Sequence, residues 1–286
     1  MSRRGHVHGA VPVVLALALC ACEGARTDAA PSQVTQADGR CGLASAAATL
    51  EATGGTAHDR VLACEALRRV LSFLAEQGVA AERRVDVEFR DTVTWSPSDT
   101  SAGEAAAMPG DEGPEATEAV TSGHGPGAGD RVVGLFDRRR GAVLMTSEAT
   151  PWLRDFAYFG QVMSDELITT LLAHEISHAV ARNLHGAGRH DRDTDLRVRR
   201  ECAAYVVQLA TMDQSVREAV LARYSTSRPE TTRRDADDDG AINSLVLALA
   251  PEAFGVSCYR RFAGAAGGKA FLESLYSGAF RPWPVF

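Results

Sequence analysis

Residues 167–181 read LITTLLAHEISHAVA, an apolar run that holds an HExxH motif at His174, Glu175 and His178. On a helix, residues four apart lie one above the other, so the two imidazoles can bind one zinc ion. Glu175 is turned by about 100° from His174, so it can reach a water molecule on such an ion without being a ligand. The motif therefore predicts a helix and a metal site in the same stretch.

The ends of this helix are marked by capping signals. Ser164 is a plausible N-cap, and Asp165 and Glu166 place negative charge in the first turn. Gly186 is a typical C-terminal stop. Together they bracket a helix of about twenty residues.

The apolar residues of this helix share a face opposite the two histidines. They are Ile168, Leu172, Ile176 and Ala179. We expect this face to pack in the core and the histidine face to open to a cleft. The alternative is a pair of solvated histidines on an ordinary amphipathic helix.

A catalytic zinc ion usually takes a third protein ligand. The metzincin pattern is excluded, because Ala181 and Leu184 stand where it needs Gly and His. A second helical stretch, residues 196–210, carries an ExxA pattern at Glu201 and Ala204, with 22 residues between it and the HExxH motif.

HExxH followed by a helical ExxA resembles the gluzincin metallopeptidases, and the chain is similar to uncharacterised bacterial exported or lipoprotein members with this motif pair. The resemblance covers about forty residues, 171–210. It implies that His174, His178 and Glu201 bind Zn²⁺ and that Glu175 is the general base. It also implies an α+β, zincin-like fold, with a small mixed or antiparallel sheet packed on the active-site helix and a mostly helical C-terminal part.

Other residues compete for the remaining roles. Asp191, Asp193 and Asp195 are rival third ligands, and Glu201 could instead be a solvated helix carboxylate.

Tyr205 and Gln208 lie on the same helical face as Glu201, so either could orient a ligand or donate to a developing oxyanion; Tyr205 is our second catalytic candidate. His185 and His190 are alternative oxyanion donors.

Outside the motifs, apolar spacing predicts a helix over residues 58–77 and a strand over 84–95. Residues 131–136 and 142–146 predict a β-hairpin. From the gluzincin resemblance we expect residues 141–147 to form the cleft wall and to pair with an extended peptide. The alternative is an ordinary sheet edge.

Further helices are expected at residues 214–224, 245–250 and 269–276, and they would complete the core.

The N-terminus predicts export. Arg3 and Arg4 precede the apolar run 11–19, which is too short to span a bilayer permanently, so residues 1–21 are a signal peptide. Residues 19–22, LCAC, resemble a bacterial lipobox, and cleavage before Cys22 would leave a lipid anchor there. Ordinary cleavage near residues 24–25 is the alternative. We expect a periplasmic or outer-envelope protein, with a flexible tether at residues 22–38.

Besides Cys22, four cysteines remain after the signal, which predicts two disulfides in an oxidising compartment. Three connectivities are possible. The shorter chain closures favour Cys41 with Cys64 and Cys202 with Cys258.

Residues 96–130 hold seven Gly and four Pro without an aromatic residue, Leu or Ile, which predicts a disordered insertion in a single metallopeptidase-like domain, 39–286. Asp235, Asp237 and Asp239 match the first half of an EF-hand loop, so Ca²⁺ is a candidate ligand there. Val246 stands where that loop needs its bidentate Glu, so a solvated acidic turn is the alternative.

Composition excludes one class of partner. The formal charge of −7 becomes −9 when Arg3 and Arg4 leave with the signal, and such an acidic chain does not favour nucleic acid. The sequence thus predicts a zinc-dependent peptidase, acting on a peptide or protein substrate outside the cytoplasm. The alternative is a catalytically silent, zinc-stabilised lipoprotein that serves as a binding module.

Overall fold

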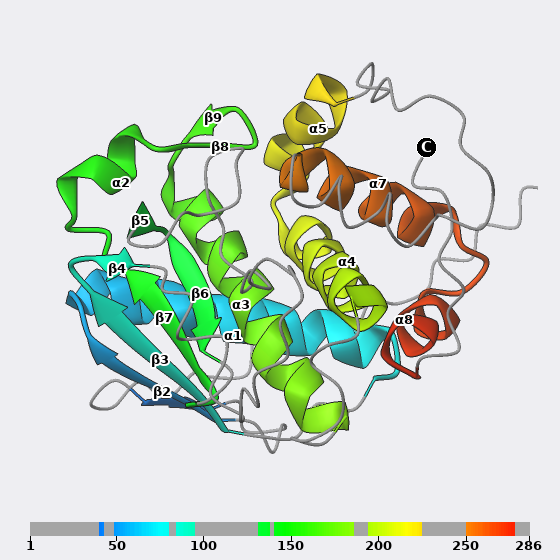
Figure 1. Ribbon diagram of the computed structural model, residues 1–286, viewed down its shortest axis with the longest axis horizontal. Coiled ribbons are helices and arrows are strands. Elements are labelled where there is room, and N and C mark those ends of the chain that lie inside the picture. Colours follow the sequence, from blue (N-terminus) through cyan, green and yellow to red (C-terminus); the bar gives the residue numbers. More distant parts are fainter. Residues whose placement is uncertain are drawn as a thin grey trace, which may run out of the picture. The chain divides into compact units, whose positions relative to one another are not determined.

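Apolar and polar residues alternate along strand β3, Arg84–Arg90, which lies at the centre of a five-stranded mixed sheet (Figure 1). Val85, Val87 and Phe89 are buried, as the alternation predicts. The strand order is β1-β2-β3-β7-β6. The other four strands are β1 (Arg40–Gly42), β2 (Thr49–Gly54), β6 (Gly134–Asp137) and β7 (Ala142–Thr146).

The computed structural model describes residues 40–42, 49–79, 84–94, 131–137, 140–185, 194–224 and 250–277. These residues all belong to one compact unit of the chain, Gln33–Phe286.

Helix α1, Ala57–Glu76, connects the parallel strands β2 and β3. A reciprocal capping box starts it, because Thr56 Oγ1 accepts from the Asp59 backbone N–H and Asp59 Oδ2 accepts from that of Thr56. Gly78, at φ 69°, follows the C-cap and ends the helix as predicted.

The hairpin predicted from residues 131–136 and 142–146 is formed by β6 and β7, which pair antiparallel. Its first strand begins later than predicted, because residues 131–132 belong to a separate strand, β5 (Arg131–Val132). The turn between them ends at Gly141, which has a φ of 68° and donates its N–H to the carbonyl of Asp137. β7 then runs parallel to β3, so the sheet is mixed.

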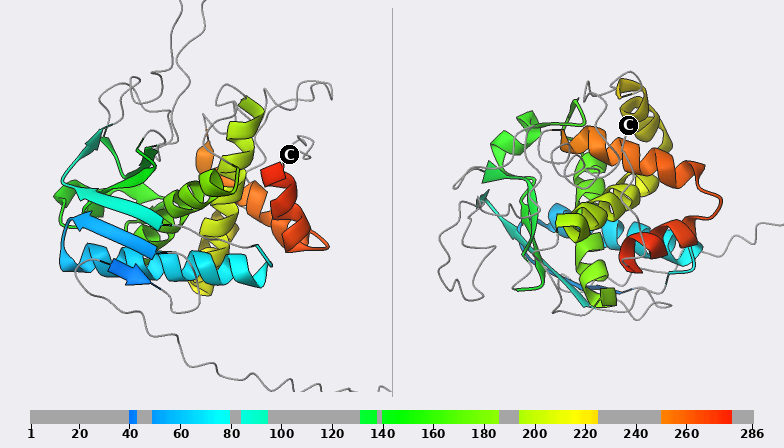
Figure 2. Two further views of the ribbon diagram at one scale, coloured as in Figure 1. Left: turned by 90° about the horizontal axis from the view of Figure 1, so that it is seen from below. Right: turned by 45° about the vertical axis from the view of Figure 1, so that its right-hand side comes forward.

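Five helices form most of the rest of the described chain. They are α3 (Asp165–His185), α4 (Thr194–Thr211), α5 (Gln214–Arg223), α7 (Pro251–Gly264) and α8 (Gly268–Ser277). Helix α3 lies between the sheet and α4 and contacts α1, β6 and β7, while α4 contacts α7 and α8 on its far side (Figures 1 and 2). The predicted α+β class, with a small mixed sheet and a helical C-terminal part, is confirmed.

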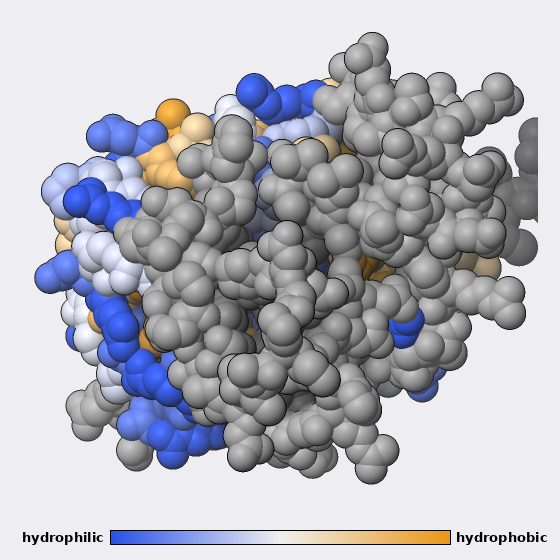
Figure 3. All heavy atoms as spheres, viewed as in Figure 1, coloured by the Kyte–Doolittle hydropathy of each residue, from blue (hydrophilic) through white to orange (hydrophobic). Residues whose placement is uncertain are grey.

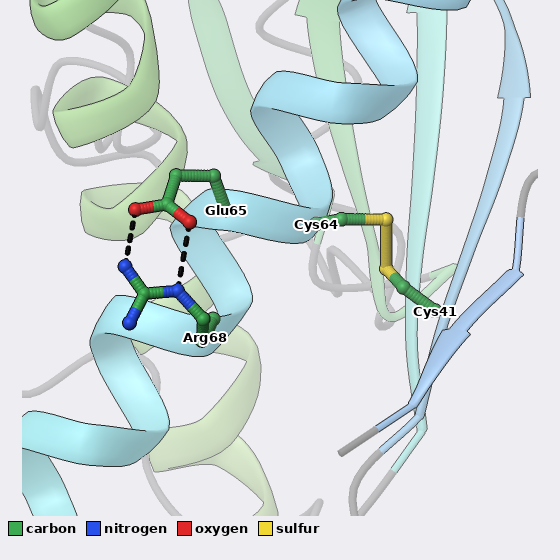
Figure 4. The surroundings of a disulfide bond; sticks show 4 residues. All are labelled: Cys41, Cys64, Glu65 and Arg68. Carbon is green, nitrogen blue, oxygen red and sulfur yellow. Dashed lines mark hydrogen bonds and ion pairs between the residues drawn. A yellow bond between two sulfur atoms is a disulfide. The ribbon is translucent and has the colours of Figure 1, made fainter. Parts of the chain in front are cut away.

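Both predicted disulfides are present. Cys41 is joined to Cys64, which ties the end of β1 to α1, and Figure 4 shows the ion pair between Glu65 and Arg68 on the next turn of that helix. Cys202 is joined to Cys258, which ties α4 to α7. Two disulfides are consistent with an oxidising compartment.

The single strand predicted at residues 84–95 is wrong in its extent. β3 stops at Arg90, and β4, Val93–Thr94, pairs with β5, Arg131–Val132, in a separate two-stranded sheet. The chain changes partners at Asp91, whose carbonyl accepts from the Thr150 hydroxyl. Asp91 stands where the alternation of Val85, Val87 and Phe89 would place the next apolar residue, so the sequence does mark the break.

Several elements were not predicted from the sequence. They are β1, β2, α7, the short helix α2 (Pro151–Asp155) and the hairpin of β8 (Ala157–Tyr158) and β9 (Gln161–Val162).

Other predictions concern residues outside the described ranges: the signal peptide and tether at 1–38, the insertion at 96–130, the calcium candidates Asp235, Asp237 and Asp239, and all but the last residue of the helix expected at 245–250.

No helix within the described ranges is long and apolar enough to cross a membrane. In the view of Figure 3, the described surface is largely hydrophilic, with a small apolar patch in the region of α2, β8 and β9. Val162 of β9 is 71% exposed.

Replacing Asp59 by Ala is expected to destabilise the fold by about 3–5 kcal/mol, because its buried carboxylate holds donors from two segments. It accepts from the Thr56 N–H at 2.7 Å, the Ser147 hydroxyl at 2.6 Å and the Glu148 N–H at 2.8 Å. Thermal unfolding followed by circular dichroism measures the loss. Asp86→Ala, at a half-exposed carboxylate, is the control; equal losses in the two variants would contradict this account.

Candidate metal centre

Helix α3 is buried on every side along its central turns. All residues from Leu167 to Val180 are buried, including the polar Thr169, Thr170 and Ser177. The prediction that its histidine face opens to a cleft is therefore wrong. Strands β6 and β7 pack on one side of the helix, and helices α1 and α4 pack on other sides, so the histidine face is covered as well.

Three ligand-type side chains converge inside this packing. His174 Nε2 lies 3.2 Å from His178 Nε2 and 3.3 Å from Glu201 Oε2, and His178 Nε2 lies 3.7 Å from Glu201 Oε1. Donors bound at 2.0–2.2 Å to a tetrahedral ion of zinc's size lie roughly 3.3–3.6 Å apart. The three residues thus form a group that could hold a metal ion.

The three side chains are almost completely withdrawn from solvent, with exposed fractions of 1% for His174, 3% for His178 and 5% for Glu201. Two helices that are adjacent in the fold supply them, α3 the histidines and α4 the glutamate. Three buried ionisable groups at these separations are costly unless a cation or a shared proton holds them together.

Glu201 is held in place by its neighbour in the chain. Cys202 follows it on α4 and is bonded to Cys258 of α7, and both cysteines are buried. The rival ligands Asp191 and Asp193 lie outside the described residues, as does the side chain of Asp195.

Of the four other predicted donors, two have described side chains and two do not. His190 lies outside the described ranges, and His185 is the last residue of α3, with no described side chain. Tyr205 and Gln208 do reach the site.

His174 is contacted from α4 by two side chains. Its Nδ1 lies 3.2 Å from Gln208 Oε1, and its ring meets the Tyr205 ring edge-on, with centroids 4.6 Å apart. Gly255 of α7 lies against the other side of Tyr205, and a Cβ at Gly255 would come within 2.4 Å of that ring. Glycine is therefore required where α7 passes Tyr205.

Tyr158 is a further member of the site that sequence analysis missed. Its hydroxyl donates to Gln208 Oε1 at 3.1 Å, and its side chain is 1% exposed. Phe159 and Gly160 follow it at φ 50° and 66°, which forms the tight turn between β8 and β9. The Phe159 N–H donates to Glu252 Oε1 of α7, which helps to hold this uncommon backbone conformation.

Burial dominates the electrostatics of the two tyrosines. It raises the pKa of Tyr158 and of Tyr205 well above 10, and the nearby Glu175 and Glu201 carboxylates add to the rise for Tyr158 and Tyr205 respectively. Both hydroxyls therefore keep their protons at neutral pH, and that of Tyr158 donates to Gln208.

Strand β6 lies against the other side of the motif. The Phe136 ring stacks on the His178 ring, with centroids 6.4 Å apart. A Cβ at Gly134 would lie 3.3 Å from Glu175 Cγ and 3.0 Å from the Met145 sulfur. A larger residue at this position would therefore crowd the buried carboxylate of Glu175.

The strand order corrects one prediction. β7 is an interior strand between β3 and β6, so residues 141–147 are not a sheet edge that could pair with a peptide. The edge position beside α3 belongs to β6. Hairpin signals give the pair of strands, but they do not say which one becomes the edge.

A second group of ligand types, His58, Glu148 and Asp165, differs from the first. Arg154 already contacts both carboxylates, and His58 Nε2 lies 2.9 Å from Asp165 Oδ2. The guanidinium supplies the positive charge, so we interpret this group as an ion-pair network that joins α1, α2 and α3.

Comparison with curated proteins and comparison with solved structures each found no significant match. The profile of a family of unknown function, DUF6639, matches residues 116–284. This range is more than half of the chain and includes α3, α4 and α7, which supply the three candidate ligands and the disulfide beside them. The chain therefore belongs to the DUF6639 family, a family of unknown function.

Proposed function

We propose that this protein is a zinc-dependent peptidase that hydrolyses peptide bonds outside the cytoplasm. The observation that carries the proposal is the convergence of His174, His178 and Glu201 at separations of 3.2–3.7 Å, with Glu175 next to the first ligand on the same helix. Two nitrogen donors and one carboxylate are a ligand set that catalytic zinc uses.

In this proposal the two histidines and Glu201 bind the metal, and Glu175 is the general base. When bound, zinc supplies Lewis acidity towards a carbonyl oxygen and towards water. Glu175 takes a proton from the attacking water and passes it to the leaving amine. It suits this role because a carboxylate beside the ligands is needed for proton transfer and not for holding a metal.

Substrate must gain access to these residues. Glu175 is 0% exposed and its nearest ligand neighbours are almost as buried. Binding of a peptide therefore requires the groups that cover the site to move, as happens in enzymes whose lids close over the reaction.

Burial also favours a second candidate function. Structural metal sites are closed, whereas catalytic sites keep a position for water. A zinc-stabilised lipoprotein that docks a partner and does not hydrolyse peptides is therefore the alternative. Cleavage of peptides by the metal-loaded protein separates the two.

The cellular setting is part of the proposal. Two disulfides support an oxidising compartment. The lipobox-like residues 19–22 favour anchoring through Cys22.

Removal of metal is expected to abolish activity and to lower stability. The purified mature protein should contain one zinc per chain, and a chelator should reduce cleavage of a peptide library more than about 100-fold, with recovery on adding zinc. The melting temperature should fall with chelation, because a ligand at 100 times its Kd stabilises the folded state by about 2.7 kcal/mol.

Three outcomes are distinguishable in this experiment. Zinc without cleavage supports the binding module, and cleavage that survives chelation contradicts the metal mechanism. Absence of stoichiometric metal contradicts both zinc functions.

A further inference from the structure

We infer that Gln208 is a positioning residue for His174, and that Tyr158 fixes the orientation of its amide so that His174 Nε2 stays free of a proton. The inference rests on the proposed zinc site and deepens it: it assigns the groups that prepare one ligand for the metal.

The geometry begins at one oxygen atom. Gln208 Oε1 lies 3.1 Å from the Tyr158 hydroxyl and 3.2 Å from His174 Nδ1. An amide oxygen can accept two hydrogen bonds, and both of its neighbours here can donate. All three side chains are at most 1% exposed, so bulk water does not replace either bond.

The orientation of the amide decides which nitrogen of His174 carries the proton. With the oxygen towards the ring, Nδ1 must be the donor, so the neutral ring has a lone pair on Nε2. That nitrogen is the one that faces His178 and Glu201. If the amide turned over, its NH₂ group would need Nδ1 as an acceptor, and the proton would lie on Nε2 and block the metal.

The other end of the amide does not hold it. Gln208 Nε2 has no hydrogen-bond partner among the described residues, although it is buried. The hydrogen bonds to Gln208 Oε1 therefore set the orientation of the amide. Loss of the Tyr158 hydroxyl should change which nitrogen of His174 carries the proton.

A neutral amide also suits this position. Glu175 and Glu201 already place two buried carboxylates near the histidines. An amide gives the same acceptor atom as a carboxylate without a third buried negative charge.

The first test measures zinc affinity by competition with a chromophoric chelator. Tyr158→Phe and Gln208→Leu are each expected to weaken zinc binding by about 10–100-fold. The double variant should lose no more than Gln208→Leu alone, because both changes act through one oxygen. Gln208→Glu keeps that acceptor and should bind zinc within about threefold of the wild type or more tightly.

Tyr259→Phe is the matched control, because it deletes the same atom at a half-buried ring that packs on Phe262. Its zinc affinity should stay within about twofold of the wild type.

The second test uses metal-free protein, so it stays informative even if the zinc proposal fails. Two-bond ¹H–¹⁵N NMR spectra of the imidazoles should assign His174 as the Nδ1–H tautomer in the wild type. In Gln208→Leu and in Tyr158→Phe the Nε2–H form should become populated, while Tyr259→Phe keeps the wild-type pattern. Thermal unfolding identifies any variant that fails to fold, and Tyr158→Phe serves alone if Gln208→Leu does so.

The inference is overturned if His174 keeps one tautomer in both variants, or if their zinc affinities match that of Tyr259→Phe. A wild type that binds no zinc but shows the Nδ1–H tautomer, lost in the variants, contradicts the proposed function and supports the positioning role.

Discussion

Glu175→Gln is expected to keep its zinc and to lose peptide hydrolysis by about 1,000-fold, since general base catalysis contributes roughly 10²–10⁴. The amide has the size of the carboxylate but cannot accept the proton of water. Its position is fully buried, with β6 packed against it at Gly134, so an isosteric change should leave the surrounding packing intact.

Initial rates on a peptide substrate and zinc content by mass spectrometry are the two measurements. The matched control is Glu273→Gln, the same change at an exposed glutamate of α8, which should match the wild type in both. Hydrolysis at the wild-type rate in Glu175→Gln would exclude this residue as the base.

The second large effect is expected at Glu201. Glu201→Gln should weaken zinc binding by about 100-fold or more. The binding free energy of a structural zinc site is about 10–16 kcal/mol, which is roughly 3 kcal/mol for each of four ligands. Its carboxylate oxygens lie 3.3 Å and 3.7 Å from the two histidine nitrogens, close to the separation of donors around one zinc ion.

The rival ligands supply the comparison for this test. A triple variant with Asn at Asp191, Asp193 and Asp195 should retain wild-type zinc affinity, measured with the same competing chelator. If the triple variant loses zinc and Glu201→Gln keeps it, the third ligand comes from the aspartates and the ExxA assignment is wrong.

Local sequence signals predicted much of the candidate site. The four-residue spacing of His174 and His178 fixes their relation on any helix, and Ser164 does cap α3, with its hydroxyl accepting from the Leu167 N–H. The disulfides followed from the lengths of chain that they close. The histidine spacing and the helix cap depend on neighbours in sequence, where the geometry is nearly independent of the rest of the fold.

Contacts between residues far apart in the chain were harder to predict from the sequence. Tyr158 lies 50 residues from Gln208, and nothing in the short β8–β9 hairpin indicates that its hydroxyl meets α4. Gly255 interrupts the apolar pattern of α7, although the close approach to Tyr205 is what requires it. The burial of α3 on all sides was missed because His174 and His178 lie opposite the apolar residues of the helix, which suggested an open face. The buried residues also include the polar Thr169, Thr170 and Ser177. Two of these hydroxyls, those of Thr170 and Ser177, instead donate to carbonyls of the helix itself.

The bond between Cys202 and Cys258 makes the intervening chain a closed loop, with a sequence separation of 56. A single proteolytic cut anywhere between these cysteines yields two fragments that remain covalently linked. After a cut between Cys202 and Gly255, Glu201 would lie on one fragment and Gly255, which packs on Tyr205, on the other, so the bond would keep α4 and α7 joined beside the candidate ligands. Nicked protein should therefore run as one chain on a non-reducing gel and as two after reduction.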